Sequence, residues 1–373
     1  MIRFENVTKK YGDYIAVSNI SFTIEDGKIV VLIGESGCGK TTTLKMVNRL
    51  ITQTSGEIYI NNVNIETMDV IELRRSIGYV IQQIGLFPHM TVKENVTLIA
   101  QIKKIDEKTI NNQLQKLMNM VELDPEHFLD RYPTELSGGE QQRVGFVRAF
   151  LTDPEIVLMD EPFSALDPLT RKDLQEELLK IQLMLHKTIV FVTHDMDEAL
   201  KLADKICIMD HGKIVQYDTP ENILRSPKNE FVRKFVGEKK IWSFPEFIHA
   251  SDIMIPAKKT CRPSEKVEEI KKWMEENNIE VLPVIDENGI LLGTVDYKNI
   301  CSQGGNLVAK EIYFRNYIEV QVNSKLPEIL EIFNKNKKLQ EFHLIVRDNE
   351  RLCGIITERS LVQTLQSYIN PNN

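Results

Sequence analysis

Short runs of aliphatic and β-branched residues alternate with stretches of helical periodicity over the first two-thirds of the chain. Four of these runs are apolar throughout, as expected for strands buried on both faces: Ile29–Ile33, Ile156–Met159, Ile189–Val192 and Ile206–Met209. Such strands separated by helices are typical of a largely parallel sheet covered by helices. We therefore predict an α/β domain over residues 1–237.

The interval Lys93–Tyr132 breaks this alternation. It is rich in Asn, Gln, Lys and Glu, places Leu and Met at helical spacing, and has no strand-like run. This pattern predicts a helical subdomain, at about residues 85–155, inserted into the α/β core.

The last third of the chain repeats itself. Leu282–Gly293 aligns without a gap to His343–Gly354, and an amphipathic stretch precedes each copy. The apolar positions of the two stretches have helical spacing: Val267, Ile270, Trp273 and Met274 in the first, Leu326, Ile329, Leu330 and Phe333 in the second. Each copy alone is small for a stable core. We therefore expect an α+β module of two packed repeats, residues 251–307 and 308–370, after a linker at 238–250.

The composition excludes several classes of protein. A formal net charge of −8 argues against wrapping a nucleic-acid polymer, and the apolar runs fall far short of the ~20 residues that a membrane-spanning helix needs. Five cysteines without CxxC spacing indicate reduced thiols rather than a disulfide framework or a zinc site. The first residues lack the apolar stretch of a secretory signal, so we expect the protein to stay in the cytosol.

A glycine-rich segment directly follows the first buried run. It reads Gly34-Glu35-Ser36-Gly37-Cys38-Gly39-Lys40-Thr41-Thr42 and matches GxxxxGK[ST] up to Thr41. Glycines let consecutive backbone N–H groups curl around phosphate oxygens, and the N-terminus of the following helix adds a favourable dipole. Lys40 would bridge the β- and γ-phosphates, and Thr41 would offer its hydroxyl to Mg²⁺. The loop needs only a small side chain at Cys38; a thiol whose pKa is lowered by the helix and Lys40 is the alternative.

A second buried run ends in Asp160-Glu161-Pro162. An acid at the tip of a strand beside the phosphate loop would hold Mg²⁺ through a water molecule, which is the role we assign to Asp160. Glu161 lies one residue further out, where it would polarise or deprotonate the water that attacks the γ-phosphorus.

The segment Ser137-Gly138-Gly139-Glu140 supports two interpretations. Its first and last residues form an S-x-x-E capping box at the start of a predicted helix, Gln141–Leu151. The box does not explain the two glycines, because glycine in a first helical turn costs roughly 1 kcal/mol relative to alanine. A bare helix N-terminus lets a phosphate approach the free N–H groups, so the segment is also a candidate second anion site.

The order of GESGCGKT, LSGGEQQR and LMDEP resembles the ATP-binding subunit of ABC transporters over about two-thirds of the chain. The resemblance implies further site residues. Tyr11 lies where the family places an aromatic ring that stacks on adenine. Gln82, rather than its neighbour Gln83, matches the glutamine that meets Mg²⁺ and the attacking water. His194 matches the histidine that contacts the γ-phosphate, and Asp167 ends the loop that links two active sites.

The same resemblance implies a head-to-tail homodimer. ATP with Mg²⁺ would lie between the phosphate loop of one chain and the segment from Ser137 to Glu140 of the other, so that one chain cannot complete a site. ATP would close the dimer and hydrolysis would reopen it, which moves integral membrane permease subunits lodged near Gln82–His89. An extracellular or membrane-tethered solute-binding protein would supply the solute. The chain itself would be peripheral, at the cytoplasmic face of the cell membrane.

The duplicated tail resembles a tandem cystathionine-β-synthase (CBS) module through Val-Ile-Asp-x-x-Gly-x-Leu-x-Gly in its first copy. Many such modules bind adenine nucleotides through Gly-h-h-[Ser/Thr]-x-x-Asp, where h is apolar. Here the first copy has Asp296 and Asn299 at the two key positions, and the second keeps Thr357 without the final Asp, so AMP or ATP binding in the usual way is not expected. A cyclic dinucleotide such as cyclic di-AMP is compatible, with Ile355, Thr357 and Arg359 as its candidate site. A tail that only holds two subunits together is the alternative.

ABC subunits with a tandem CBS tail resemble those that serve glycine betaine, carnitine, choline and related compatible solutes. This resemblance gives the expected function: an ATPase that energises the import of such a solute, with the tail sensing a nucleotide or ionic strength. Import of another small solute, such as methionine or a polyamine, is one alternative. A soluble ABC protein of DNA repair or translation is another, although those usually carry two cassettes or a long coiled coil, and neither feature is in this sequence.

Overall fold

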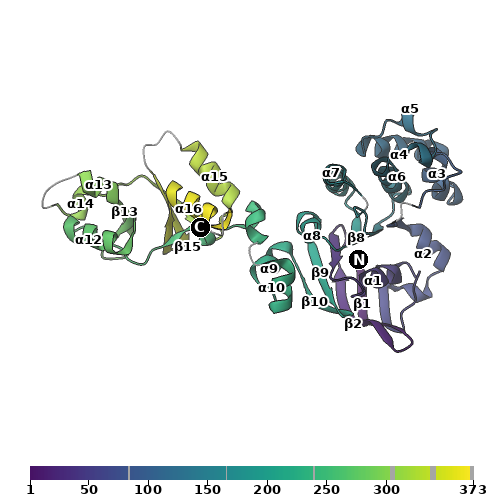
Figure 1. The fold of residues 1–373 in the computed structure, drawn as a ribbon, viewed down its shortest axis with the longest axis horizontal. Coiled ribbons are helices and arrows are strands. Elements are labelled where there is room, and N and C mark those ends of the chain that lie inside the picture. Colours follow the sequence, from purple (N-terminus) through teal and green to yellow (C-terminus); the bar gives the residue numbers. More distant parts are fainter. Residues whose placement is uncertain (83–84, 165, 238–239, 303–306, 337–341, 370–373) are drawn as a thin grey trace. The chain divides into compact units, whose positions relative to one another are not determined.

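The computed structural model describes the chain except residues 83–84, 165, 238–239, 303–306, 337–341 and 370–373. The chain divides into two compact units, Met1–Val236 and Gly237–Asn373, each with hydrophobic cores of its own (Figure 1). Within the described residues, no helix combines the length and the apolar character needed to cross a membrane.

A six-stranded sheet forms the centre of the first unit. Its order is β10-β9-β3-β8-β7-β6, and all neighbours run parallel except β10, which pairs antiparallel with β9 at one edge. The strands are β3 (Ile29–Ile33), β6 (Ile77–Val80), β7 (Ile156–Asp160), β8 (Thr188–Thr193), β9 (Lys205–Asp210) and β10 (Lys213–Asp218). All four apolar runs predicted as strands lie in this sheet, and β3, β7 and β8 are buried along their whole length.

A second, antiparallel sheet packs on helix α1 (Lys40–Val47). Its order is β2-β1-β4-β5, with β1 (Ile2–Tyr11), β2 (Tyr14–Ile24), β4 (Ser55–Ile60) and β5 (Val63–Asn64). The rings of Phe4 and Phe22 stack with centroids 4.6 Å apart and share one core with Leu44 and Met46 of α1. This core anchors the helix that follows the glycine-rich loop.

Between β6 and β7 the described residues form helices and no strand, as predicted for the inserted subdomain. These helices are α3 (Val92–Ile102), α4 (Glu107–Met120), α5 (Pro125–Phe128) and α6 (Gly138–Phe150). Helix α6 begins three residues earlier than predicted, because the capping box opens it directly after Ser137. The other helices of this unit are α2 (Val70–Ser76), α7 (Pro168–Leu185), α8 (Met196–Leu202), α9 (Pro220–Arg225) and α10 (Glu230–Val236).

A buried asparagine fixes the loop between β6 and α3. Asn95 of α3 is fully buried, and its amide oxygen accepts the Phe87 N–H at 2.7 Å. Its amide nitrogen donates to the carbonyl oxygens of Phe87, Met90 and Thr91, each at 3.0 Å. A single side chain therefore supplies the acceptor for the Phe87 N–H and adds a donor for three carbonyls of this loop, two of which, Phe87 and Thr91, also accept a backbone N–H.

The second unit contains two related repeats, each with the predicted order of helix, strand, turn and strand. The first has α12 (Val267–Asn277), β12 (Val281–Ile285) and β13 (Leu291–Asp296), followed by α13 (Tyr297–Ser302) and α14 (Ala309–Ile312). The second has β14 (Tyr317–Gln321), α15 (Leu326–Lys335), β15 (His343–Asp348), β16 (Arg351–Ile356) and α16 (Glu358–Ile369).

The two repeats are joined by shared packing. An apolar cluster takes side chains from both: Val281, Leu291, Ile345 and Ile355. The segment before the first repeat packs on the second one, because β11 (Ile255–Pro256) pairs antiparallel with β16 and α11 (Ala250–Ile253) enters the second repeat's core. Residues 248–256, which we expected to end the linker and open the first repeat, are therefore held by the second repeat.

Replacing Asn95 by leucine should destabilise the first unit. The substitution keeps the volume but leaves the Phe87 N–H and three loop carbonyls without this partner. We expect the free energy of unfolding to fall by about 2–3 kcal/mol, measured by urea unfolding followed by circular dichroism.

The control is Gln101→Leu on the same helix, whose exposed amide donates only to Thr97 Oγ1 at 3.1 Å and should cost less than about 0.5 kcal/mol. Equal stability of the two variants would show that the loop needs no anchor.

Candidate active site

Two close backbone approaches shape the loop between β3 and α1. A Cβ atom on Gly34 would lie 2.1 Å from the Met209 carbonyl oxygen, and one on Gly39 would lie 2.4 Å from that of Ala16. Gly39 also has a φ of 102°, which strains any residue with a side chain. Lys40 is 7 % exposed, and its Nζ donates to two loop carbonyls at 2.7 and 2.8 Å. The loop therefore encloses the ammonium group of Lys40. Phosphate oxygens of a ligand can replace the Gly34 and Glu35 carbonyls as its hydrogen-bond acceptors.

A hydroxyl and a carboxylate meet at the start of α1. Thr41 Oγ1 donates to Asp160 Oδ1 at 2.9 Å, and Asp160, at the end of β7, is 5 % exposed. Lys45 Nζ lies 3.5 Å from Asp160 Oδ2 and offsets part of the buried negative charge. Both groups offer oxygen, which is the donor that Mg²⁺ prefers. The residues predicted to hold this ion therefore fit it chemically.

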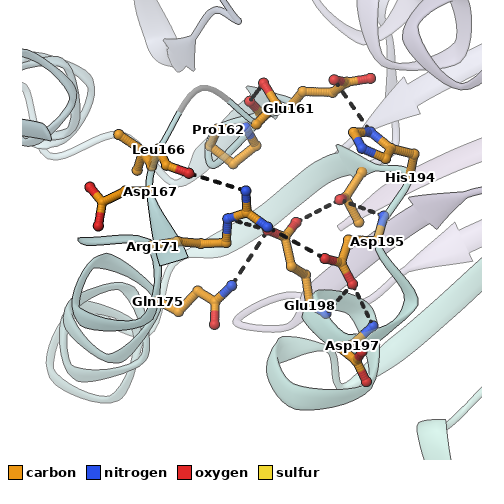
Figure 2. A network of polar contacts seen from close by, with 12 residues as sticks. Glu161, Pro162, Leu166, Asp167, Arg171, Gln175, His194, Asp195, Asp197 and Glu198 are labelled. Atoms are coloured by element: carbon orange, nitrogen blue, oxygen red, sulfur yellow. Dashed lines mark hydrogen bonds and ion pairs between the residues drawn. The ribbon is translucent and has the colours of Figure 1, made fainter. Parts of the chain in front are cut away.

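The structure brings Gln82 and His194, two predicted site residues, together at Glu161. Glu161 Oε2 accepts from Gln82 Nε2 at 3.1 Å and lies 3.5 Å from His194 Nδ1 (Figure 2 draws the His194 contact). The backbone of Glu161 is left-handed, with a φ of 46°, and its N–H donates to the Val192 carbonyl at 3.0 Å. Since a side-chain-bearing residue rarely adopts this conformation, the strands around Glu161 determine where its carboxylate lies. The alternative Gln83 lies outside the described residues.

A cavity of about 370 Å³ is lined both by the glycine-rich loop and by Glu161 and His194. Its lining also includes Lys40 and Thr41 at the start of α1, and Tyr11 at the end of β1. Its volume is within the range of small-molecule pockets. The predicted loop residues do not all face it, because Glu35 and Cys38 line a neighbouring cavity of about 240 Å³.

Tyr14 is a site residue that the sequence reasoning missed. It pairs with Tyr11 across the β1–β2 hairpin and lines the same cavity, and its hydroxyl donates to the Gly37 carbonyl at 3.1 Å. Lys9 Nζ lies 4.8 Å from the centroid of the Tyr11 ring. Two exposed aromatic rings at the mouth of a cavity offer flat faces for a purine base. The sequence did offer a signal for Tyr14: only two residues, Gly12 and Asp13, separate it from Tyr11, which is the spacing of a tight hairpin that places the two tyrosines opposite each other.

The Cys38 thiol is buried beside the loop lysine. Burial raises its pKa, and the smaller effect of the Lys40 charge in the opposite direction does not cancel this. The structure therefore argues against the alternative in which Cys38 is a reactive thiolate.

The segment from Ser137 to Glu140 forms the predicted capping box. Ser137 Oγ accepts the Glu140 N–H at 3.3 Å, and the Glu140 carboxylate accepts the Ser137 N–H at 2.7 Å. A Cβ on Gly139 would lie 2.6 Å from Thr170 Cγ2 of α7, whereas one on Gly138 would meet no atom within 4 Å. Close packing against Thr170 thus explains why residue 139 is a glycine, whereas Gly138 faces open space. Neither the cap nor the glycines line the 370 Å³ cavity of the described chain.

Asp167 ends its loop by capping α7. Its Oδ1 accepts the N–H groups of Leu169 and Thr170, both at 3.1 Å. A hydrogen bond from the Thr170 side chain, followed by the one from the Thr170 N–H, lowers the pKa of Asp167. Ser164 Oγ donates to the Glu161 carbonyl at 3.1 Å. The loop is therefore connected to Glu161 at one end and to α7 at the other.

The predicted regulatory site in the tail is nearly closed. Ile355 and Thr357 line a cleft with an interior of about 10 Å³, close to the space of one water molecule. Thr357 and Ser360 share three hydrogen bonds of 2.9 to 3.0 Å. Arg359 forms an ion pair with Glu280 of the first repeat. A ligand of nucleotide size must therefore open this cleft and compete for Arg359.

Comparison with known proteins identifies both parts of the chain. The family model for the ABC transporter matches residues 17–164, and the model for the CBS domain matches residues 250–303 and 309–367.

Curated relatives match nearly the whole length. The choline transport ATP-binding protein OpuBA of Bacillus subtilis is 44% identical over 97% of this chain and 95% of its own. The carnitine transport ATP-binding protein OpuCA of Listeria monocytogenes is 43% identical over 99% of this chain and 93% of its own.

Among solved structures, the dimeric structure of MJ0796, a bacterial ABC transporter cassette, has a TM-score of 0.54 and 35% identity. It covers 59% of this chain and 99% of that one. A post-hydrolysis state of the same cassette, bound to ADP and Pi, gives the same values.

These matches confirm the expected fold class, a P-loop ABC ATPase core followed by a tandem CBS module. The chain belongs to the ABC transporter family, as an ABC ATPase with a C-terminal pair of CBS domains.

Proposed function

We propose that this chain is the ATP-hydrolysing subunit of an importer for a compatible solute such as glycine betaine, carnitine or choline. The observation that carries the proposal is the convergence of Gln82 and His194 on the Glu161 carboxylate, beside the cavity that the phosphate loop lines. A carboxylate held in this way is placed to act on a water molecule next to the last phosphate of a bound triphosphate.

The loop and the residues below it would hold the nucleotide. Backbone N–H groups and Lys40 would bind the phosphates, and Thr41 and Asp160 would hold Mg²⁺. When bound, the ion neutralises negative charge on the phosphate oxygens. The rings of Tyr11 and Tyr14 would contact the base.

The catalytic side chains would act on the attacking water. Glu161 accepts its proton while the water oxygen bonds to the γ-phosphorus and the bond to the ADP oxygen breaks. Gln82 orients the water through its amide, and His194 contacts the γ-phosphate.

A head-to-tail homodimer would complete the site. Gly138, at the N-terminus of α6, faces open space in the described chain and has no share in that chain's own cavity. A second copy would present this N-terminus to the γ-phosphate and bring the loop that ends at Asp167 to the opposite phosphate loop. The related cassette, whose structure is dimeric, supports pairing of two copies.

The proposed solute and partners rest on the relatives, whose names specify choline and carnitine transport. Integral membrane permease subunits would form the path through the membrane, and a separate solute-binding protein would deliver the solute. The chain would then act as a peripheral subunit at the cytoplasmic face of the membrane. Its CBS pair would lower uptake in response to a cyclic dinucleotide or to ionic strength.

The Glu161→Gln variant should bind ATP but turn it over at least about 100-fold more slowly, because an amide cannot take the proton of the attacking water. Phosphate release and Mg²⁺-ATP binding by the purified chain measure the two effects. Glu155→Gln, the same change at an exposed position before β7, is the control and should keep wild-type turnover. Near-normal turnover by Glu161→Gln would remove Glu161 from its role.

Uptake assays with the same two variants address the solute. In cells that express the chain with its membrane subunits, Glu161→Gln should abolish accumulation of labelled glycine betaine, carnitine or choline, and Glu155→Gln should not. Glu161-dependent accumulation of methionine or a polyamine instead would replace the proposed solute. ATP turnover that affects no uptake would favour a soluble ABC protein.

Gly138→Asp should block hydrolysis without unfolding the chain. The new side chain has open space, and an acid in the first turn of α6 favours the helix dipole. Its charge would repel a phosphate at this N-terminus. Lys40→Ala should also be inactive by itself, because its glycine-rich loop lacks the lysine that would bind the phosphates.

Mixing these two inactive variants tests the shared site. Half of randomly paired dimers are mixed, and each mixed dimer has one sound loop facing one sound α6, so about a quarter of the wild-type rate should return. A mixture no faster than its components, with melting temperatures unchanged, would contradict a site built from two chains.

Freeing Arg359 should tighten the binding of cyclic di-AMP to the full chain. Glu280→Gln removes the carboxylate that competes with a ligand phosphate, and we expect a Kd lower by up to about fivefold, the strength of an exposed ion pair. Arg359→Ala should weaken binding in the same calorimetric titration. If no variant gives heat, the salt dependence of ATP turnover separates an ionic-strength sensor from a tail that only joins subunits.

A further inference from the structure

Figure 2 shows a network of polar contacts near Glu161 and His194. Three of its charged residues, Arg171, Asp195 and Glu198, have no role assigned so far. At its centre is Arg171, in the first turn of α7. Its Nη2 donates to the Leu166 carbonyl at 3.1 Å, its Nη1 lies 3.7 Å from Asp195 Oδ2, and its Nε lies 3.9 Å from Glu198 Oε1. One guanidinium therefore contacts both the loop that ends at Asp167 and the start of α8.

The start of α8 is also the segment that carries His194. Thr193 Oγ1 donates to Glu198 Oε2 at 2.6 Å and accepts the Asp195 N–H at 3.0 Å. Asp195 Oδ1 in turn caps α8. These contacts hold the residues on both sides of His194 and so determine where its ring meets the catalytic carboxylate.

The charge of Arg171 stabilises this segment. Glu198 is 5 % exposed, and burial raises its pKa; the Asp195 charge adds to this, while the Thr193 hydrogen bond and Arg171 oppose it. Without Arg171, two carboxylates would repel each other across the residues that carry His194. A guanidinium suits this place because its planar, permanently charged fork can serve a carbonyl and two carboxylates at once.

We propose that Arg171 and Glu198 are positioning residues for hydrolysis, which align His194 with Glu161 according to the position of the loop that ends at Asp167. The inference rests on the proposed function, in which this loop faces the second chain. A shift of the loop moves the Leu166 carbonyl, and the guanidinium transmits the shift to the start of α8. Occupancy of one ATP site thereby changes the catalytic geometry of the other.

The network stands apart from the nucleotide. Within the described structure, neither Arg171 nor Glu198 lines the 370 Å³ cavity. Loss of the pair should therefore lower kcat for ATP and leave its KM nearly unchanged.

A double-mutant cycle on the full-length chain tests whether Arg171 acts through His194. Arg171→Met should lower kcat about tenfold, the effect of losing a hydrogen bond donated by a charged group, with KM for ATP within about twofold. In a His194→Ala background the same change should have no further effect, because the group that it positions is gone. Arg225→Met, which removes another partly buried arginine ion pair at 3.4 Å on α9, is the matched control and should leave kcat at the wild-type value.

Two milder variants cover the case in which Arg171→Met fails to fold. Arg171→Lys keeps the charge without the planar guanidinium, and Glu198→Gln keeps the shape without the charge. Each should lower kcat less than Arg171→Met does. In the His194→Ala background, neither should change kcat further. Losses that add to that of His194→Ala would show a purely structural role and overturn the inference, as would a wild-type kcat in Arg171→Met. A wild-type chain without ATP turnover would overturn the proposed function and this inference together.

Discussion

The whole site depends on the parallel register of three central strands. Thr193, the end of β8, is paired with the end of β3, and its neighbour Val192 is paired with Asp160, the end of β7. The three strands therefore finish at one edge of the sheet, and the residues that follow these ends are Gly34, His194 and Glu161. Since the strands are buried throughout, their backbone groups have no alternative partners, and the register holds the glycine-rich loop, Glu161 and His194 close together.

Much of this arrangement was predictable, because it follows from the order of apolar and polar residues within short segments of the sequence. Uninterrupted apolar runs mark buried strands, and the residues that end such runs must share an edge when the strands are parallel. The role proposed for Asp160 followed from this logic, and those of Lys40 and Thr41 followed from the glycine-rich motif after the first buried run. The structure places the Thr41 hydroxyl against the Asp160 carboxylate, and Lys40 and Thr41 line one cavity. The repeat in the tail was visible for the same reason, since it repeats both helical spacing and strand pattern.

What was missed depends on pairings between distant segments. No local pattern states that residues 248–256 pack on the second repeat, or that Arg359 is engaged by Glu280. Tyr14 was missed because its position follows from the hairpin that pairs it with Tyr11. The contacts of Arg171 join segments whose charged residues look, in the sequence, like ordinary solvated helix faces.

Gly139 has a mechanical consequence beyond the cap that it follows. Its hydrogen leaves just enough room for Thr170, so the first turns of α6 and α7 touch directly, and further along α6 Arg143 forms a 2.9 Å ion pair with the buried Glu177 of α7. Two such contacts tie the two helices together, so we expect a displacement of one to move the other. A rotation of the inserted helices would therefore displace the N-terminus of α6 and the Asp167 cap of α7 together and in the same direction.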